Sequence, residues 1–382
     1  MVRQEWRLLF LLLAVGASSS CAGTPPSARL SPSSTTLVDV ASAEVSVTAE
    51  ENLLDRDSGQ DVVPTTAQAI DDFESWPLTG IQDDQVGNWP VLIVKIDNHD
   101  RARPQSGVNS ADVVFEEIVE GGLTRFAALF HSQQAEHVGP IRSVRTSDFD
   151  LLHNLNRPLF ANSGGNEAVL ELLQEVDYVD VSSNAAMDVY ERMEERPSPH
   201  NLFSDTKSLR TVGTSRGDGG SPPIMFVRQD TSDGLPASAT PVTGVDLDYG
   251  STFVSYRWSQ QEGWVRTQNG TTHVDTEGVA VTPEVVIVQV VSYTRSRADG
   301  RSPEAVLLGE GKSLVFFGGS LIEGTWKRTQ AEDVTRYFDR DGLPIALPPG
   351  RVWIALPRVG QVQVVKLVTA GSVVPNQRRD VP

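Results

Sequence analysis

The chain has 382 residues, a formal net charge of −18 and a hydrophobic fraction of 39%. This length allows a large buried core and suggests two domains rather than one. The excess of acidic residues, without any continuous basic stripe, excludes nucleic acid as an expected partner.

The first 21 residues are typical of an export signal. A basic start, "MVRQEWR", precedes the apolar run 8–17, which is too short to span a bilayer. Cys21 is the only cysteine of the chain and follows small residues, as at a lipoprotein processing site. We therefore expect a lipid on Cys21 that anchors the protein extracytoplasmically, at the cell membrane. Ser18 stands where such sites usually carry Leu, so secretion without an anchor is the alternative.

Residues 22–75 are predicted to form a disordered acidic tether. They are rich in Ser, Thr, Ala and Pro, and contain ten acidic residues against two basic ones, Arg29 and Arg56. Such a segment buries too little apolar surface to fold. With Cys21 lipidated, the rest of the chain has no thiol for a disulfide, a metal site or catalysis.

Residues 76–215 predict an N-terminal α/β domain. Apolar runs indicate strands at 91–96, 112–119, 125–132 and 158–165. Helix signals lie between them, at 147–155 with Ser147 as N-cap and at 166–176 starting from Asn166. We expect this half to be a layered mixed α/β sandwich.

The stretch "SRGDGGSPP", residues 215–223, is typical of a domain boundary or a long loop. Beyond it, residues 224–370 predict a β-rich C-terminal domain of strands and turns. Alternation around Val254, Tyr256 and Trp258 indicates one covered face. The fold class predicted for the whole chain is α+β.

Two fragments imitate catalytic motifs without completing them. "GEGKS", residues 309–313, ends like a phosphate-binding loop but lacks the opening Gly, because position 306 is Val306. We predict a hairpin turn there instead. "SDTK", residues 204–207, lacks the later motifs of penicillin-binding enzymes. No motif predicts a cofactor or a metal site.

Polar residues concentrate where the predicted strands of the first half end. Because loops beyond strand ends converge in open α/β sheets, we expect these residues to meet in one crevice. The predicted ligand-binding residues are Asn98, Arg103, Gln105, Glu117, Arg125, Arg142, Arg145, Asp148 and Asn201.

Arg142 and Arg145 stand three residues apart, directly before a predicted helix. One interpretation is that they recognise an anion such as a carboxylate or a phosphate. The other is that they pair internally with Glu116, Glu117 or Asp148 and bind no ligand.

His99 and His200 are the histidines that best suit acid–base chemistry. His99 follows Asp97, and His200 lies in "PSPHNLF". Asp97, His99 and His200 are therefore the catalytic candidates of an alternative hypothesis, an envelope hydrolase or transferase acting on wall polymers.

Several stretches resemble a known family. "KIDNHDRARPQSGVNSADVVFEEIVEGGLTRFAALFHS", "VGPIRSVRTSD", "SGGN" and "PHNLF" in the first half, with "GKSLVFFGGSLIEGTW" and "PPGRVWIAL" in the second, resemble the YerB-like lipoprotein family of unknown function. The resemblance covers about residues 76–357. It implies a bacterial envelope lipoprotein with a layered mixed α/β fold, and no established reaction or cofactor.

The leading hypothesis from the sequence is an envelope lipoprotein that binds an anionic ligand or a protein partner at the N-terminal crevice. The ligand could be a small molecule or a wall polymer. Whether the protein is an enzyme stays open, and a scaffold that contacts envelope proteins through its β-rich half is a further alternative.

Overall fold

The computed structural model describes residues 74–217, 219–229 and 234–367. All of these residues belong to one compact unit. The predicted signal, its Cys21 and nearly all of the predicted tether lie outside the described residues, so they stay predictions. Within the described ranges, no helix is long and apolar enough to cross a membrane.

The described residues are rich in β-strands and form three α-helices. The helices are α1 (Ser147–His153), α2 (Glu167–Leu173) and α3 (Thr206–Arg216). The strands before residue 217 are β1 (Glu74–Ser75), β2 (Gln82–Asp83), β3 (Leu92–Asp97), β4 (Val113–Ile118), β5 (Thr124–Phe130), β6 (Leu159–Ala161), β7 (Val179–Asp180), β8 (Glu191–Arg192) and β9 (Leu202–Phe203). The later strands are β10 (Thr240–Asp248), β11 (Phe253–Ser259), β12 (Gly263–Gln268), β13 (Thr271–Thr272), β14 (Val285–Gln289), β15 (Tyr293–Arg295), β16 (Pro303–Ala305), β17 (Gly309–Phe317), β18 (Ser320–Arg328), β19 (Arg336–Asp339), β20 (Val352–Ala355) and β21 (Val362–Lys366). This composition confirms the mixed, β-rich class expected from the sequence.

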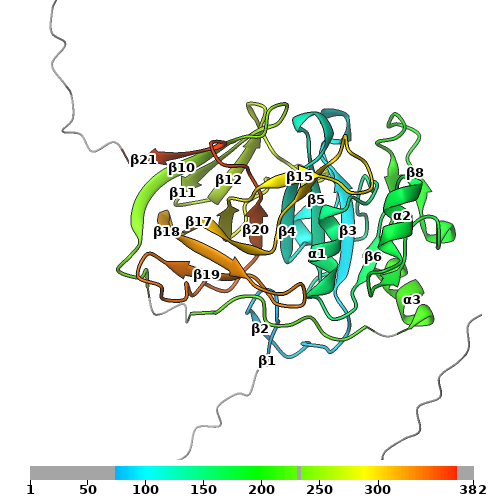
Figure 1. Cartoon of the computed structure of the whole chain (residues 1–382), viewed down its shortest axis with the longest axis horizontal. Coiled ribbons are helices and arrows are strands. Elements are labelled where there is room, and N and C mark those ends of the chain that lie inside the picture. The colour runs from blue at the N-terminus through cyan, green and yellow to red at the C-terminus, as the bar shows by residue number, and fades with distance from the viewer. Residues whose placement is uncertain (1–73, 218, 230–233, 368–382) are drawn as a thin grey trace, which may run out of the picture. The chain divides into compact units, whose positions relative to one another are not determined.

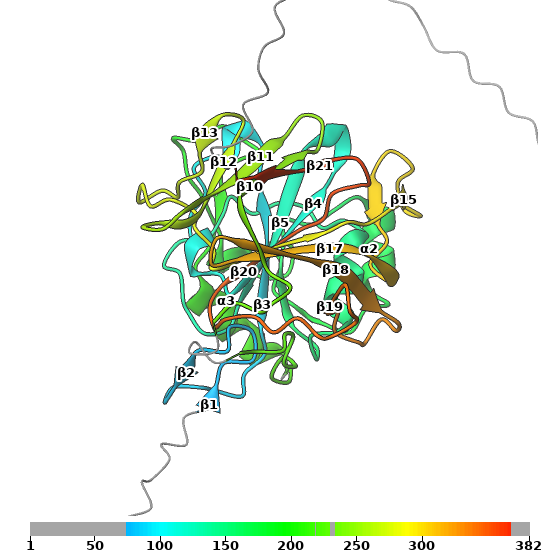
Figure 2. The ribbon, with the colours of Figure 1, turned by 90° about the vertical axis from the view of Figure 1, so that its left-hand side faces the viewer.

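One mixed sheet of 15 strands runs through both halves of the described chain, in the order β13-β12-β11-β10-β18-β17-β14-β20-β4-β5-β3-β6-β7, with β19 on β18 and β21 on β10. The halves meet where β20 pairs in parallel with β4. Figure 1 shows the three helices with β3, β5, β6 and β8 on the right of the view, β1 and β2 at the bottom, and β10–β12 on the left. Figure 2, turned by 90°, shows β17 and β18 crossing below β10–β12.

Alternate residues of β3 enter two different hydrophobic cores. Leu92, Val94 and Ile96 pack on one face, whereas Ile93 packs on the other with the apolar side chains of α1 and α2. Successive strand residues point to opposite faces. Lys95 and Asp97 therefore share the face covered by α1 and α2, and the candidate site lies on that face.

Residues 309–313 do not form the predicted hairpin turn. They are the first part of β17, which pairs with β18 from Gly309↔Arg328 to Phe317↔Ser320. A Cβ at Gly311 would lie 2.6 Å from the Trp326 ring, so this glycine permits a close approach within a strand. The turn itself is made by Gly318 and Gly319, both with positive φ.

Helix starts agree with the sequence only in part. Asn166 caps α2, since its side chain accepts a hydrogen bond from the Val169 N–H at 2.9 Å. Ser147 is not a cap, because α1 begins at Ser147 and its hydroxyl accepts from the Ala305 N–H. Helix α3, capped by Asp205, was not predicted. The predicted strand at 158–165 is shorter, and forms β6 only.

Candidate functional site

The candidate site begins at the ends of β3, β5 and β4. Asp97 is opposite Arg125 in the β3–β5 register, and Arg125 is opposite Glu117 in the β4–β5 register. All three side chains point to the face covered by α1 and α2, because they alternate with Ile96 and Phe126 of the other core. Pleating alone therefore places these two carboxylates and the guanidinium on one face of the sheet.

A second segment brings Arg142 to the same edge. Ile141 forms a β-bridge with Ile96, and the Arg142 N–H donates to the Lys95 carbonyl at 2.8 Å. On its other side, the Ile141 N–H donates to the Leu202 carbonyl at 2.6 Å, which holds the "PHNLF" segment alongside. Distant parts of the chain therefore converge beside Asp97, as the strand-end argument predicts.

Asp97 is the acceptor around which this edge is organised. Its Oδ2 lies 2.6 Å from His200 Nδ1 and 3.1 Å from Arg142 Nε. The Arg142 contact has the distance of an ion pair, but Nε makes no hydrogen bond of acceptable geometry within the described residues. Asp97 Oδ1 accepts from the His99 N–H at 3.1 Å. Asp97 itself is only 3% exposed.

The two candidate histidines stack on each other. Their ring centroids are 4.6 Å apart with an interplanar angle of 21°. His99 Nδ1 accepts from the Arg101 N–H at 3.0 Å, so the neutral ring carries its proton on Nε2. His200 uses Nδ1 toward Asp97, and its Nε2 has no hydrogen-bond partner in the described part of the chain.

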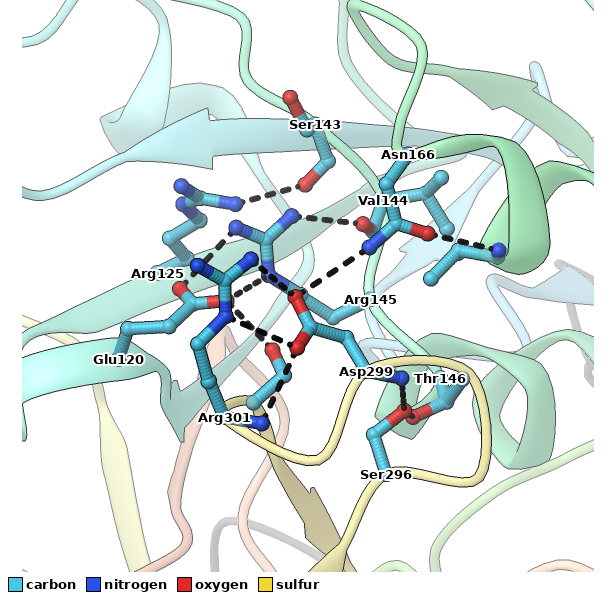
Figure 3. A network of polar contacts seen from close by, with 12 residues as sticks. Glu120, Arg125, Ser143, Val144, Arg145, Thr146, Asn166, Ser296, Asp299 and Arg301 are labelled. Carbon is cyan, nitrogen blue, oxygen red and sulfur yellow. Dashed lines mark hydrogen bonds and ion pairs between the residues drawn. The ribbon is translucent and has the colours of Figure 1, made fainter.

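Arg125, Arg142 and Arg145 form what we call the arginine cluster. Arg145 is held firmly: its Nε and a terminal nitrogen donate to the two oxygens of Glu120 at 2.8 and 3.0 Å, and its other terminal nitrogen donates to the Val144 carbonyl. Figure 3 shows Arg125 and Arg145 side by side above Glu120. Burial raises the pKa of Glu120, but hydrogen bonds from Arg145 and Ser302 outweigh it and lower that pKa to about 2.

Arg125 and Arg142 are less well matched. Arg125 is 7% exposed, and its guanidinium makes one hydrogen bond among the described residues, to the Ser143 carbonyl at 3.0 Å. Burial and the positive charges of Arg145 and Arg142 lower its pKa to about 10. The terminal nitrogens of Arg142 have no acceptor within the described ranges, and its side chain is 20% exposed. Guanidinium donors therefore remain free at this edge.

Glu117 and Asp148 are not at this edge but enclosed beneath α1. The Lys95 ammonium contacts a Glu117 oxygen and lies 2.6 Å from Asp148 Oδ1, with all three side chains at most 2% exposed. Burial, with the neighbouring Asp148 charge, raises the pKa of Glu117 to about 7. These two predicted ligand-binding residues instead anchor α1 to the sheet.

Asn98 and Gln105 lie on the opposite face of the sheet, in a second enclosed network. Gln105 donates to the Asn98 side-chain oxygen at 3.0 Å and contacts His273 at 2.8 Å. His273 in turn contacts Arg266, whose guanidinium lies 2.7 Å from Glu116. Both predicted site residues are at most 1% exposed, so they connect the two halves of the chain.

The remaining predicted residues lie at the periphery. Arg103 donates to Asp100 at 2.9 Å, and the Asn201 side chain accepts from Arg192 at 2.8 Å. Neither contacts the arginine cluster.

Sequence reasoning missed Glu120, the carboxylate that holds Arg145. Neither Arg142 nor Arg145 forms a side-chain ion pair with Glu116, Glu117 or Asp148, which were the expected internal partners. Only the Arg145 backbone N–H reaches Asp148, at 2.7 Å. The Gly pair after Glu120 was the available signal, because glycines with positive φ (Gly121 at 70° and Gly122 at 72°) turn the chain back at this edge.

Within the described ranges, no group of three or more His, Cys, Asp or Glu side chains could hold a metal ion. The arrangement offers guanidinium donors for an oxyanion and an Asp–His pair that could move a proton.

Two family models match the chain. Residues 78–218 match "Protein of unknown function (DUF3048) N-terminal domain", and residues 245–354 match "Protein of unknown function (DUF3048) C-terminal domain". The arginine cluster, Asp97 and His200 all lie in the first match.

Two Bacillus subtilis comparisons agree with these matches. The chain is 31% identical over 308 residues to "Putative lipoprotein YerB" of strain 168, covering 77% of this chain and 88% of that protein. A crystal structure of the YerB protein superposes with a TM-score of 0.68 at 26% identity, covering 77% of this chain and all of that one. The family resemblance seen in the sequence is confirmed.

Proposed function

Since this chain belongs to the DUF3048 family of proteins of unknown function, we propose that it is a bacterial cell-envelope lipoprotein that binds an anionic ligand at the arginine cluster. The export signal with Cys21 and the similarity to a protein named as a lipoprotein support the location. The ligand is a small anion or a wall polymer, and an acidic envelope protein is the alternative partner.

One observation carries the binding proposal: the arginine cluster has more donors than internal acceptors. Two carboxylates, Asp97 and Glu120, face three guanidinium groups. Asp97 is shared with His200, and Arg125 has only a carbonyl as its acceptor among the described residues. Burying an arginine without a matched acid is costly, so an oxyanion that supplies acceptors would be bound favourably.

The test is calorimetric titration of the mature protein with inorganic phosphate and with citrate. Arg142→Gln should weaken binding by about tenfold or more, since it removes charge-assisted hydrogen bonds. Arg142→Lys should retain part of the affinity. Arg340→Gln is the matched control, because Arg340 is 73% exposed and pairs with Glu323, outside the cluster.

The thermal unfolding transition of each variant should be measured, because it separates a loss of ligand binding from a loss of the folded structure. A folded Arg142→Gln protein with unchanged affinity would contradict the proposal. Unfolding of Arg142→Gln and Arg142→Lys together would favour a purely structural network.

The anchor has its own test. In a bacterial host, Cys21→Ala should move the protein from the membrane fraction to the medium or to the soluble envelope fraction, and should remove labelling by a fatty-acid analogue. Membrane retention with unchanged labelling would contradict lipidation at Cys21.

The Asp97–His200 contact supports a second candidate function. An aspartate that orients a histidine through Nδ1 and leaves Nε2 free has the geometry of a general base. The candidate reaction is hydrolysis or transfer on wall polymers. Turnover of wall fragments should fall about 100-fold or more in His200→Ala, as expected for loss of general acid–base catalysis. Undiminished turnover in both His200→Ala and His99→Ala would remove these roles.

A further inference from the structure

A second basic region adjoins the arginine cluster. It is a cleft of about 430 Å³ between the turn at Glu120–Gly122 and the β15–β16 hairpin. Arg295, Arg301 and Arg358 line it, and Glu120 is its one acidic lining residue in the described chain. In an acidic protein, three arginines around one hollow make a local positive potential.

Two of these arginines have free guanidinium groups. The Arg358 guanidinium lies 4.7 Å from the centroid of the Tyr293 ring and has no acceptor within the described residues. Arg295 is exposed, and its side chain has no partner in the same part of the chain. Arg301 differs, because it pairs with Asp299 at 3.2 Å. The cleft therefore presents two unmatched cations.

Tyr293 holds the Arg358 guanidinium in a defined position. Its hydroxyl donates to the Leu356 carbonyl at 2.8 Å and accepts from the Ile118 N–H at 3.1 Å. The ring is thus fixed between β4 and the chain after β20. A guanidinium stacked on a fixed aromatic ring loses little conformational entropy when it binds an anion.

Glu120 joins the cleft to the arginine cluster. Its carboxylate accepts from Arg145 of the cluster and from the Ser302 hydroxyl of the cleft. Because Arg145 already neutralises Glu120, this acid does not offset Arg295 or Arg358. Figure 3 shows that Arg125, Arg145, Glu120 and Arg301 form a continuous tract. Arginines with unused donors therefore lie on both sides of two ion pairs, Arg145–Glu120 and Arg301–Asp299.

We infer that the ligand is a linear polyanion of repeating phosphate groups, one bound at Arg125 and Arg142 and another at Arg295 and Arg358. This inference rests on the proposed function and deepens it. Phosphate is favoured over carboxylate because each group offers more acceptor oxygens, which suits guanidinium groups arriving from separate elements. The acidic remainder of the surface limits contact to this tract.

The test compares affinity for inorganic phosphate, tripolyphosphate and long-chain polyphosphate by calorimetry at constant ionic strength. Affinity per chain should rise by about tenfold or more from phosphate to polyphosphate, since a second subsite acts on an already bound chain. The double variant Arg295→Gln/Arg358→Gln should lose this gain and should bind inorganic phosphate at the arginine cluster alone. Arg142→Gln should weaken the binding of both phosphate and polyphosphate, and Arg340→Gln should weaken neither.

The outcomes separate the two proposals. If the double variant keeps the full chain-length gain, or if no gain exists, the polyanion inference is wrong and the proposed function stands. If the double variant loses binding and Arg142→Gln does not, the arginine cluster is not the site. Tighter binding of poly-glutamate than of polyphosphate at matched length would overturn the choice of phosphate.

Discussion

Arg266 on β12 and Glu116 on β4 form an ion pair of 2.7 Å in which both side chains are 0% exposed. The residues are 150 positions apart and come from the two segments matched by the family models. The guanidinium also lies over the rings of Phe126 and Trp353. This pair is a central polar link between the halves of the chain.

Removing one partner of this pair should be costly. Arg266→Met leaves Glu116 as an uncompensated buried charge, so we expect a loss of about 3–5 kcal/mol in the free energy of unfolding. Urea denaturation followed by tryptophan fluorescence measures it. Arg336→Met, an exposed change on β19, should cost under about 1 kcal/mol. Equal effects of the two variants would contradict the central role of the pair.

Glu117 predicts a pH dependence. Its folded pKa of about 7 lies above the ordinary 4.5, because of burial and the nearby Asp148. Proton binding therefore favours the folded state: the contribution is fully present below pH 4.5 and is lost as the pH rises through about 7. Between pH 4.5 and about 7 this proton should change the free energy of unfolding of the parent protein by an amount on the order of 1–3 kcal/mol. Glu117→Gln cannot ionise, so the variant should lack this change. A parallel profile in variant and parent would refute the shift.

His131 should give the free energy of unfolding a pH dependence of the opposite sign. Its ring is buried beside Trp76 and Trp89, and burial lowers its pKa to about 4. Its contribution is present above pH 6.5 and lost as the pH falls through about 4, because the unfolded state then binds the proton more tightly. The positive charge of Arg210 also lowers this pKa, and Asp112 accepts a hydrogen bond from the His131 backbone N–H. Nuclear magnetic resonance titration should find the His131 ring neutral at pH 5.5, and a charged ring there would exclude this explanation.

Glu120 offers a gain-of-affinity prediction. Glu120→Gln removes a negative charge from between the arginine cluster and the cleft, so phosphate affinity should rise by about two- to tenfold at low salt. The rise should fade at high ionic strength. Glu167→Gln, an exposed change at the start of α2, is the control for general charge effects. Lower affinity in Glu120→Gln would mean that holding Arg145 in place matters more than the charge it neutralises.

Local sequence patterns predicted the strands that carry the site. They failed for an element that is stabilised mainly by tertiary packing. The apolar runs at 91–96, 112–119 and 125–132 became β3, β4 and β5. In contrast, helix α3 has few apolar residues, and its stability comes from packing of Leu209 and Gly213 against the sheet. Periodicity alone could not detect it.

The sequence predicted the composition of this edge only in part. Asp97 and Arg125 lie at the ends of predicted strands, whereas Arg142 and His200 reach the edge through segments that the sequence did not indicate as strands. The parallel pairing of β20 with β4 joins residues about 240 positions apart, and no single-sequence pattern encodes such a register. The contributions of Tyr293 and Arg358 were therefore invisible in the sequence.

Strand β4 has a first-half neighbour on one side and a second-half neighbour on the other. Expressed separately, fragments cut near residue 220 would each expose the bare hydrogen-bonding edge of a central strand, and we expect each to aggregate. Mixed together during refolding, they should complement one another. We therefore expect that neither half can be transplanted alone as a folding module.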